Sequence, residues 1–361
     1  MTIFHVTSAH TRYDSRIFSK ECVSLVKAGY NVNLIVCDGL GDEIKSGVSI
    51  IDAGNFREKA RLKRFRESPK AIKKILLQNN PDVIHFHDPE LLFIGLFFSR
   101  RKVKVIYDSH ENVPKQILSK PYIPVFFRKI ISLMMSVCEN YVVKRLTGVV
   151  TVTEELYARF LKINSCVYLV RNFPELSYFP DIDFTKKDNS FVYAGGITQI
   201  RGFSQMSEAA LKSKVKITMY GPKDSDCVFD NVNSYIEYKG NIRQSELFSV
   251  LSHASVGMIL FHKVPNHMVC SPNKLFEYMA SGMAVIASDI PMWKDIVEKY
   301  KCGLCVDPSN AGAIAETMAW CVEHPEEVMV MGKNGMEAVR TVFNWESESK
   351  KLINLYSVLS Q

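Results

Sequence analysis

Long hydrophobic runs, a recognisable export signal and internal repeats are all missing from this 361-residue sequence. No stretch reaches about 18 uncharged apolar residues, so we expect no transmembrane helix. The opening MTIFHVTSAH has neither a basic segment nor a long apolar one, and it predicts a first β-strand rather than a secretory signal peptide. An odd number of cysteines, nine, without an export signal indicates reduced thiols in the cytoplasm.

Metal and redox motifs are also scarce. Cys302 and Cys305 have the spacing of a zinc or redox pair, but there is no second CxxC, and the pair lies in a strand-like KCGLCVDP run. Asp224 and Asp226 have the spelling of a DxD metal pair but fall in a polar segment after a Gly-Pro turn. We therefore expect no bound metal.

Basic residues are unevenly distributed, although the formal net charge of +7 is modest. From Arg57 to Lys74 nine residues are basic and two are acidic. Such a run favours contact with an anionic membrane surface, with a solvated helix face as the close alternative. No nucleic-acid-binding motif accompanies it, so we expect no nucleic-acid partner.

Short β-branched runs alternate with helical patterns, which is typical of parallel α/β sheets. Helices are expected over Ile17–Ala28, over Pro69–Gln78 and from about Ile123 to Arg145. The strands expected in the first half are Ile3–Thr7, Val32–Cys37, Val48–Ile51, Val83–Phe86, Val103–Tyr107, Gly148–Val152 and Val167–Val170.

A second series of strands follows the segment Arg171-Asn172-Phe173-Pro174, which predicts two α/β sheets joined near residues 172–188. Ligands of open α/β sheets bind beyond the carboxyl ends of the strands, so we expect the chemistry in the strand-to-helix loops. The strands expected here are Phe191–Ala194, Val215–Tyr220, Tyr235–Tyr238, Val256–Leu260 and Ala284–Ala287.

The first strand of the first half is followed by a loop rich in polar residues. It contains His10, Arg12, Asp14 and Arg16 just before an expected helix. Arginines beside a helix N-terminus form an anion site through guanidinium and backbone N–H groups. The alternative is an N-cap by Asp14 or Ser15, with the arginines solvated.

Two further loops of the first half carry histidines. His85 and His87 share one face of a strand, and Asp88 precedes a helix; packing and capping are favoured over a metal pair, because no third ligand is evident. His110 follows another strand, in YDSHE, where an imidazole can donate to a hydroxyl or a phosphate oxygen. A single histidine is, by itself, more often structural.

The second half carries sharper signals. After a strand ending at Ala194, Gly195 and Gly196 would let the backbone approach phosphate oxygens, and Arg201 could neutralise them. The spacing is not GxGxxG, so NAD binding is not favoured.

The strongest segment is SPNKLFEYMASGMAVIASD, which begins at Ser271. Ser271 as N-cap and Pro272 as the first helical residue predict a helix start. That end offers N–H groups to a diphosphate, and Lys274 is near it. Glu277, about one turn further, can accept from the two hydroxyls of a ribose.

At this segment the chain resembles the family-4 glycosyltransferases of the GT-B fold. The run EYMASGMAVIA from Glu277 matches the family's carboxylate helix and the strand after it. The segment Gly195–Gly202 matches its glycine-rich phosphate loop, His110 its N-domain histidine, and Phe343-Asn344-Trp345 with the final helix its C-terminal segment. Two positions depart from the family pattern. Val269 replaces the first glutamate of E-x7-E, which leaves the sugar contacts open, and Gly196 replaces a frequent arginine, which removes one cation.

The resemblance implies an α/β GT-B fold with two Rossmann-like domains facing a central cleft and a C-terminal helix that crosses back to the N-domain. Residues 1–172 plus 345–361 would form the acceptor-side domain, and 173–344 the nucleotide-sugar-binding domain. The implied catalytic residues are His110, Arg201, Lys274 and Glu277. The implied donor-binding residues are Gly195, Gly196, Arg201, Ser271, Pro272, Asn273, Lys274, Leu275 and Glu277. His10, Arg12, Asp14, Arg16, His87 and Asp88 would form the acceptor-side or phosphate loop.

The implied activity is retaining, metal-independent transfer of a hexosyl or N-acetylhexosaminyl group from a nucleotide diphosphate-sugar, UDP rather than GDP. The acceptor would be a saccharide or a lipid-linked saccharide in polysaccharide, O-antigen or capsule synthesis. The nucleotide-sugar is a substrate, so no cofactor is expected. The expected location is the cytoplasm, where the protein would bind peripherally to the inner face of the plasma membrane. The alternatives are a non-catalytic nucleotide-sugar-binding homologue or accessory subunit and, among enzymes, a GT-B nucleotide-sugar epimerase.

Overall fold

The computed structural model describes residues 1–56, 61–120, 123–229 and 234–360. Contacts between Cα atoms divide the chain into two compact units. The first unit comprises Met1–Asn172 and Ser347–Gln361, and the second comprises Phe173–Glu346. Each unit has its own hydrophobic core and its own sheet.

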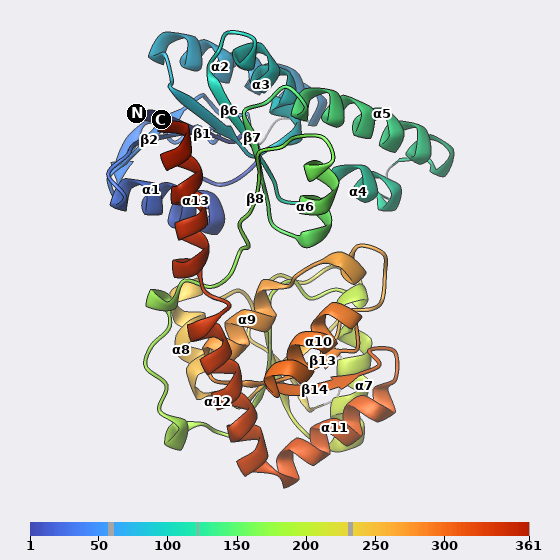
Figure 1. Ribbon diagram of the computed structural model, residues 1–361. Coiled ribbons are helices and arrows are strands. Elements are labelled where there is room, and N and C mark those ends of the chain that lie inside the picture. The colour runs from blue at the N-terminus through green and yellow to red at the C-terminus, as the bar shows by residue number, and fades with distance from the viewer. Residues whose placement is uncertain (57–60, 121–122, 230–233, 361) are drawn as a thin grey trace. The chain divides into compact units, whose positions relative to one another are not determined.

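The first unit is built on an eight-stranded sheet in the order β3-β4-β2-β1-β5-β6-β7-β8 (Figure 1). All neighbouring strands are parallel except β3, which pairs antiparallel with β4. Because β1, β5 and β6 are neighbours, the loops after them meet at one edge of the sheet. The strands are β1 Thr2–Val6, β2 Asn31–Val36, β3 Glu43–Lys45, β4 Val48–Asp52, β5 Val83–Phe86, β6 Lys104–Ser109, β7 Gly148–Thr151 and β8 Val167–Leu169.

Helices connect these strands, and two of them differ from the sequence prediction. The helix expected over Ile17–Ala28 is a π-helix, η1 (Ser15–Cys22), continued by α1 (Val23–Lys27). The helix expected over Pro69–Gln78 is α2 (Arg61–Asn79), with Pro69 inside it. The remaining helices are η2 Pro89–Leu91, α3 Leu92–Ser99, α4 Val113–Ser119, α5 Val125–Val143, α6 Glu154–Leu161 and α13 Trp345–Ser360.

The second unit is an all-parallel, six-stranded sheet in the order β11-β10-β9-β12-β13-β14. The strands are β9 Phe191–Ala194, β10 Ile217–Tyr220, β11 Ile236–Tyr238, β12 Val256–Ile259, β13 Ala284–Ser288 and β14 Gly303–Val306. The α-helices are α7 Phe203–Ser213, α8 Gln244–His253, α9 Asn273–Ala280, α10 Pro291–Tyr300, α11 Ala311–Glu323 and α12 Pro325–Thr341. The two parallel sheets predicted from the sequence are therefore confirmed.

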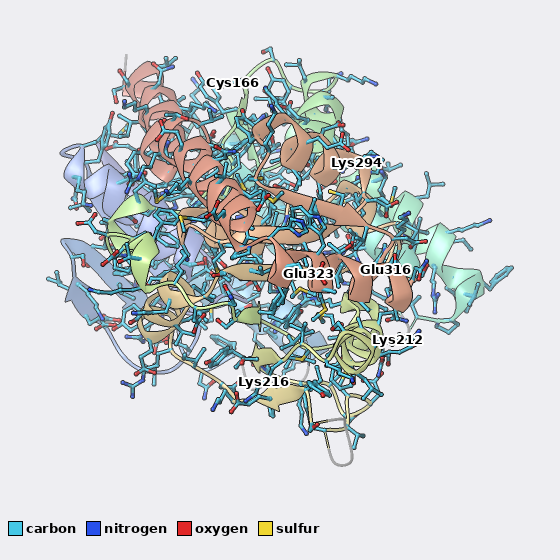
Figure 2. The ribbon with its side chains drawn as sticks, turned by 90° about the horizontal axis from the view of Figure 1, so that it is seen from below. Cys166, Lys212, Lys216, Lys294, Glu316 and Glu323 are labelled. Carbon is cyan, nitrogen blue, oxygen red and sulfur yellow. The ribbon has the colours of Figure 1, made fainter. Side chains whose placement is uncertain are left out.

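Charged side chains cover the outer faces of the second unit's helices. Lys212 on α7, Lys294 on α10, and Glu316 and Glu323 on α11 are all exposed (Figure 2). These helices are amphipathic, with a solvated face opposite the face that packs on the sheet.

The C-terminal helix α13 starts in the second unit, and its residues from Ser347 onward belong to the first. Its last turn lies beside the start of the chain, where Ser360 Oγ is 3.6 Å from Met1 Sδ. The return of the final helix to the first unit agrees with the fold implied by the resemblance. Among the residues that the structure describes, we find no helix with the length and apolarity needed to cross a membrane.

Candidate active site

The second unit has a glycine turn after β9 that leaves room for two cations. Gly195 has φ +125°, and a Cβ at this position would overlap Cε and Nζ of Lys274. A Cβ at Gly196 would overlap Nη1 of Arg201. The missing side chains therefore let both cations lie against the turn.

Among the described residues, neither of the two cations has a carboxylate within ion-pair distance. Arg201 lies in a 3₁₀ turn, and its Nη1 donates to the carbonyl of Gly196 at 3.1 Å. Nζ of Lys274 lies 5.2 Å from the ring centres of Tyr193 and of Phe261. Burial and then the charge of Arg201 lower the pKa of Lys274 to about 8. In the described part of the chain neither cation forms an ion pair, so an anion is what this turn lacks.

Helix α9 presents its N-terminus beside the same turn. The helix begins at Asn273 with Pro272 as its N-cap, so the prediction that Ser271 is the N-cap is wrong. Within the described residues, the N-cap position makes no side-chain hydrogen bond to the N–H groups of the first turn, and these groups carry the positive end of the helix dipole. Leu275 is buried in the core and its N–H donates to Pro272, so the structure does not support a donor contact by this residue.

Glu277 is half-buried on α9, three residues after Lys274 and therefore on the same helix face. Its charge raises the pKa of Lys274, in opposition to burial and Arg201. The carboxylate is thus near enough to the ammonium for its charge to affect the pKa of Lys274. This arrangement suits a ligand that has anionic groups for the lysine and hydroxyl groups for the glutamate.

Two tyrosines hold the glycine turn in place, and sequence reasoning did not single them out. The Tyr193 hydroxyl donates to the carbonyl of Gly196 at 2.6 Å, and the Tyr278 hydroxyl accepts from the N–H of Ala194 at 2.8 Å. Tyr193 stands two residues before the turn in the sequence, so its contact with the turn could have been inferred from this short distance. Tyr278 is 84 residues away from Ala194, and only the fold reveals that contact.

In the first unit, Asp88 ties the loop after β5 to the loop after β1. Its Oδ2 accepts from the Thr7 hydroxyl at 2.8 Å and from the N–H of Ser8 at 2.6 Å. His10 lies 3.5 Å from Asp88 and 3.3 Å from Asp14. Burial lowers the pKa of His10, but the bond to Asp14 and the charge of Asp88 outweigh it and raise the pKa.

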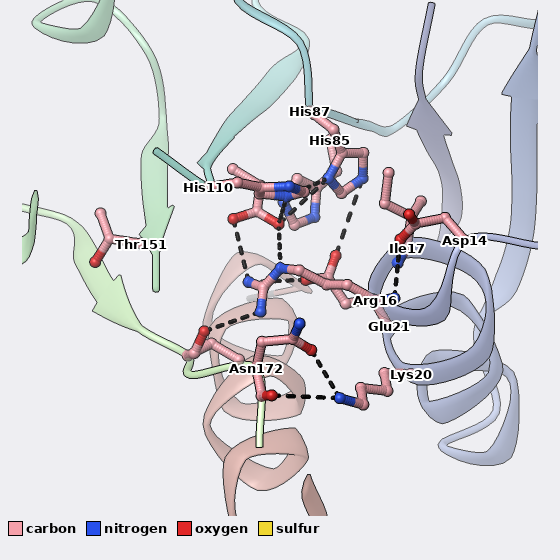
Figure 3. Close-up of polar contacts among 12 residues, drawn as sticks. Asp14, Arg16, Ile17, Lys20, Glu21, His85, His87, His110, Thr151 and Asn172 are labelled. Carbon is pink, nitrogen blue, oxygen red and sulfur yellow. Dashed lines mark hydrogen bonds and ion pairs between the residues drawn. The ribbon is translucent and has the colours of Figure 1, made fainter. Parts of the chain in front are cut away.

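The two arginines of the first loop are internally paired. Arg12 binds Asp38 through Nε and Nη2 at 2.8 and 2.6 Å. Arg16 is buried and binds Asp108 through Nε at 3.0 Å and Glu21 at 3.0 Å (Figure 3). The anion site predicted for these arginines is therefore wrong, because both charges are neutralised by carboxylates that follow much later in the sequence or lie on the next helix turn. The alternative is an N-cap by Asp14 or Ser15 with the arginines solvated. Its N-cap is confirmed for Asp14, whose Oδ1 accepts from the N–H groups of Arg16 and Ile17 at 2.9 Å, but the solvated arginines are wrong, because both side chains are buried.

His87 and His110 converge on Asp108, and His85 and His5 continue the cluster inward. Nε2 of His110 is 2.8 Å and Nδ1 of His87 is 3.2 Å from Oδ2 of Asp108. Nδ1 of His5 lies 3.0 Å from Nε2 of His87. His5, His85, His87 and Asp108 are buried, whereas the side chain of His110 is 19% exposed. Sequence reasoning named His85, His87 and His110 but missed His5 and Asp108.

Four buried side chains of this cluster, Glu21, His85, His87 and Asp108, each have one polar atom within 4.8 Å of the others. Such a group could surround a metal ion. However, the guanidinium of Arg16 already contacts both carboxylates at 3.0 Å. We assign no metal to the cluster, because the arginine supplies the positive charge that the carboxylates require.

Two family models match the chain. The family model described as Glycosyltransferase Family 4 matches residues 21–173, and the model described as Glycosyl transferases group 1 matches residues 177–338. A search among curated proteins finds no match.

Solved structures share the fold along nearly the whole chain. The sucrose-phosphate synthase of Thermosynechococcus elongatus is 19% identical with a TM-score of 0.77, covering 99% of this chain and 98% of that one. Anabaena Alr3699/HepE in complex with UDP is 11% identical with a TM-score of 0.74, covering 99% and 100%. WaaG, a glycosyltransferase involved in lipopolysaccharide biosynthesis, is 10% identical with a TM-score of 0.69, covering 98% and 99%.

The fold and the family models define a GT-B glycosyltransferase. More particularly, the chain belongs to the family-4 type, whose two models together match residues 21–338 apart from 174–176.

Proposed function

We propose that this glycosyltransferase takes its sugar from a nucleotide diphosphate-sugar, UDP rather than GDP, and that the second unit holds the donor. The observation that carries this proposal is the pair of cations, Arg201 and Lys274, on the glycine turn after β9, for which the described residues provide no ion pair. A diphosphate matches both charges, and the uncapped start of α9 adds N–H donors. The structures of Anabaena HepE with UDP and with UDP-glucose support UDP as the nucleotide part of the donor.

In the proposed reaction, the bond between the anomeric carbon and the β-phosphate oxygen breaks, and its electron pair stays on the phosphate. The acceptor hydroxyl oxygen bonds to the anomeric carbon, and its proton passes to the departing diphosphate. Arg201, Lys274 and the start of α9 would stabilise that charge as it develops, without a metal. Glu277 would hold the ribose and so fix the donor's position. Retention of anomeric configuration, hexosyl or N-acetylhexosaminyl transfer, and a role in surface-polysaccharide synthesis follow from the family resemblance alone.

The direct test is to incubate the protein with UDP- and GDP-sugars and to follow release of the nucleotide diphosphate with and without saccharide acceptors. Acceptor-dependent release from a UDP-sugar that persists in excess EDTA is the expected result. Loss of activity on chelation, restored by Mn²⁺ or Mg²⁺, would contradict the metal-independent mechanism and would direct attention to the exposed Asp224 and Asp226.

The second candidate function is a non-catalytic nucleotide-sugar-binding subunit, which Val269 favours because it replaces the first acidic residue of the family pair. Binding of UDP-sugars with no release under any acceptor condition would favour this candidate.

We also propose that the first unit meets an anionic membrane surface, where a lipid-linked acceptor would be found. Helix α5 extends beyond the sheet of the first unit (Figure 1), and several of its apolar side chains are at least 61% exposed. No acidic residue occurs in residues 112–138, while Lys115, Lys120, Arg128 and Lys129 are basic. The apolar residues of α5 that are at least 61% exposed are Val125, Phe126, Leu133, Met134 and Val137.

Helix α2 of the same unit also carries exposed basic side chains. Lys63, Arg66, Lys70 and Lys74 are exposed, whereas residues 57–60 of the predicted basic run and residues 121–122 lie outside the described residues. Apolar side chains can enter the lipid interface while basic residues contribute about 1 kcal/mol each near an anionic leaflet. A surface with both features suits a bilayer better than a second copy of the same positively charged patch.

Vesicle flotation tests the membrane proposal. We expect binding to phosphatidylglycerol-containing vesicles that weakens in high salt, and loss of binding in Phe126→Ser/Leu133→Ser. Val330→Ser, at an exposed apolar position on α12 of the second unit, is the matched control. Equal binding to neutral and anionic vesicles, or none to either, would contradict the proposal.

A further inference from the structure

The buried histidines of the first unit form a chain in which each proton position follows from the one before. The chain starts at Asp108, which is fully buried. Burial would raise the pKa of Asp108, but the charge of Arg16 and the hydrogen bonds from His110 and His87 hold it well below its usual value. The ionised carboxylate can only accept hydrogen bonds.

The nitrogens that face this carboxylate must therefore carry protons. Nδ1 of His87 lies 3.2 Å from Oδ2 of Asp108, and Nε2 of His110 lies 2.8 Å from the same oxygen. Burial lowers the pKa of His87 to about 4, although the bond to Asp108 opposes this, so the ring carries one proton at neutral pH. That proton is on Nδ1, and Nε2 of His87 is an acceptor.

The next donor is His5. Its Nδ1 lies 3.0 Å from the bare Nε2 of His87, so it must carry the proton. Burial and the proximity of His87 lower the pKa of His5 well below its usual value, so its Nε2 is bare. The hydroxyl of Tyr356, on helix α13, lies 3.2 Å from this nitrogen and can donate to it.

The last member is His85, whose Nδ1 lies 2.7 Å from the same hydroxyl. Tyr356 has one proton and has used it toward His5, so His85 donates and the tyrosine oxygen accepts. The opposite direction would place the tyrosine oxygen and the bare Nε2 of His5 against each other as two acceptors. The alternating roles thus satisfy the contacts that lead from His85 through Tyr356, His5 and His87 to Asp108. Nδ1 of His87 and Nε2 of His110 lie 3.3 Å apart, and in this order both donate to Asp108 rather than to each other.

Glu21 also faces this chain, and it does not reverse the order. Burial and the charge of Asp108 raise the pKa of Glu21 well above its usual value, against the effect of Arg16. Its Oε2 is 3.7 Å from Nδ1 of His5 and 3.9 Å from Nε2 of His87, beyond hydrogen-bond distance of both.

We infer that Asp108 is a positioning residue that fixes the proton of the singly protonated His110 ring on Nε2 and leaves its Nδ1 bare, and that the same carboxylate sets the order of protons through His87, His5 and Tyr356. His110 then meets its ligand as a hydrogen-bond acceptor. An acceptor nitrogen can take a hydrogen bond from a sugar hydroxyl but has no proton to give to an ionised phosphate oxygen. This reverses the donor role that the sequence predicts for His110. The choice of a sugar hydroxyl as the ligand group rests on the proposed function.

Two-bond ¹H–¹⁵N correlation spectra of the full chain, labelled with ¹⁵N-histidine, separate protonated from bare ring nitrogens. Single histidine substitutions assign the signals. We expect Nδ1–H forms for His5, His85 and His87 and the Nε2–H form for neutral His110, without any ligand. A neutral His110 with its proton on Nδ1, or His5 with its proton on Nε2, would overturn the inference.

Two variants sharpen this readout. Tyr356→Phe removes only the hydroxyl, so His5 should become a mixture of tautomers while His253, on α8 of the second unit, keeps its signal. Asp108→Asn should shift His110 toward the Nδ1–H form, because the amide can present its NH₂ group. An unchanged His5 signal in folded Tyr356→Phe would contradict the chain's order. A stoichiometric metal in the purified protein, removed together with a change at His85 and His87, would overturn it as well.

Adding ligands tests the acceptor role separately. UDP-glucose should shift the Nδ1 resonance of His110, and UDP alone should leave it in place. If UDP-glucose binds and Nδ1 does not move, the acceptor role is wrong. If UDP-glucose does not bind, the proposed UDP-sugar donor is in question, whereas the ligand-free spectrum still decides the tautomers.

Discussion

The polar clusters of the two units use charge in opposite ways. In the first unit, the Arg16 guanidinium contacts two carboxylates, and four histidines share their hydrogen bonds with Asp108 and Tyr356. In the second unit, Arg201 and Lys274 lie against a glycine turn, and neither forms an ion pair within the described residues. A buried charge that is already paired maintains the structure, whereas partly buried cations without a partner await a ligand.

This comparison predicts that stability depends on the first site and ligand binding on the second. The largest expected effect is on folding. Arg16→Met keeps most of the side-chain volume but leaves Asp108 and Glu21 buried without a cation, which should lower the free energy of unfolding by about 3–5 kcal/mol. Urea unfolding measures this loss, and Arg66→Met on the exposed face of α2 is the matched control. A loss below about 1 kcal/mol would mean that the cluster does not depend on this ion pair.

The second prediction concerns turnover. Arg201→Ala removes one of the two cations that would stabilise the leaving diphosphate, so kcat should fall by about 10²–10³, as for the loss of a preorganised oxyanion donor. The free energy of unfolding should stay nearly unchanged, because no carboxylate loses its partner. Arg243→Ala, at the exposed residue before α8, controls for loss of a positive charge from the same unit. Equal activity of the two variants would remove Arg201 from the donor site.

Local sequence patterns predicted the second site better than the first. The glycines and Arg201 follow one strand within eight residues, and Lys274 and Glu277 share one helix. The residues within each of these two groups are therefore close in the sequence as well as in space. In the first site, Arg16 meets Asp108 across 92 residues, and His85 meets Tyr356 across 271. No periodicity links such positions, and solvated arginines and paired arginines look the same in a sequence.

Most strands of the fold could also be predicted from local sequence patterns. Buried, β-branched strands such as Val83–Phe86 lie where the apolar runs place them, because a parallel sheet covered on both faces selects them. Strand β3 was missed: it has three residues, EIK, on an exposed antiparallel edge, and its composition carries no such signal. Ser271 is of a residue type that favours the N-cap position. However, the helix begins at Asn273, and Pro272, which has an extended backbone, is the N-cap.

The third prediction sharpens the role of Glu277. A carboxylate that accepts from ribose hydroxyls makes charge-assisted bonds worth about 1.5–3 kcal/mol each, and Glu277→Gln replaces one acceptor oxygen with a donor group. UDP affinity should fall, and KM for the donor should rise more than kcat falls if the ribose is held equally throughout the reaction. Calorimetry with UDP measures the change.

Glu298→Gln on α10 removes an exposed carboxylate from the same unit and is the control for this substitution. If Glu277→Gln changes neither affinity nor stability by more than about 0.5 kcal/mol, the residue belongs to a solvated helix face and the ribose lies elsewhere.

The smallest effect is a pH dependence that only an unpaired lysine would give. The pKa of Lys274 is about 8 in the free protein, mainly because of burial and then because of Arg201. A bound diphosphate favours the charged ammonium and must raise this pKa. UDP binding should therefore take up a proton above pH 8, and affinity should be full below pH 8 and fall by up to tenfold per pH unit above it.

Calorimetry in buffers of different ionisation enthalpy at pH 8.5 would detect that proton. The phosphate groups of UDP, with a second pKa near 6, are already ionised in this window and do not contribute. The pKa of Tyr193 is raised to about 12, chiefly by burial, so its titration lies above the window. Lys274→Arg keeps its charge throughout, and its UDP affinity should be flat from pH 7 to pH 9 even if it is weaker. If wild-type UDP affinity is also independent of pH from pH 7 to pH 9, the ammonium of Lys274 is already charged before the ligand binds. The contrast between paired and unpaired cations would then rest on Arg201 alone.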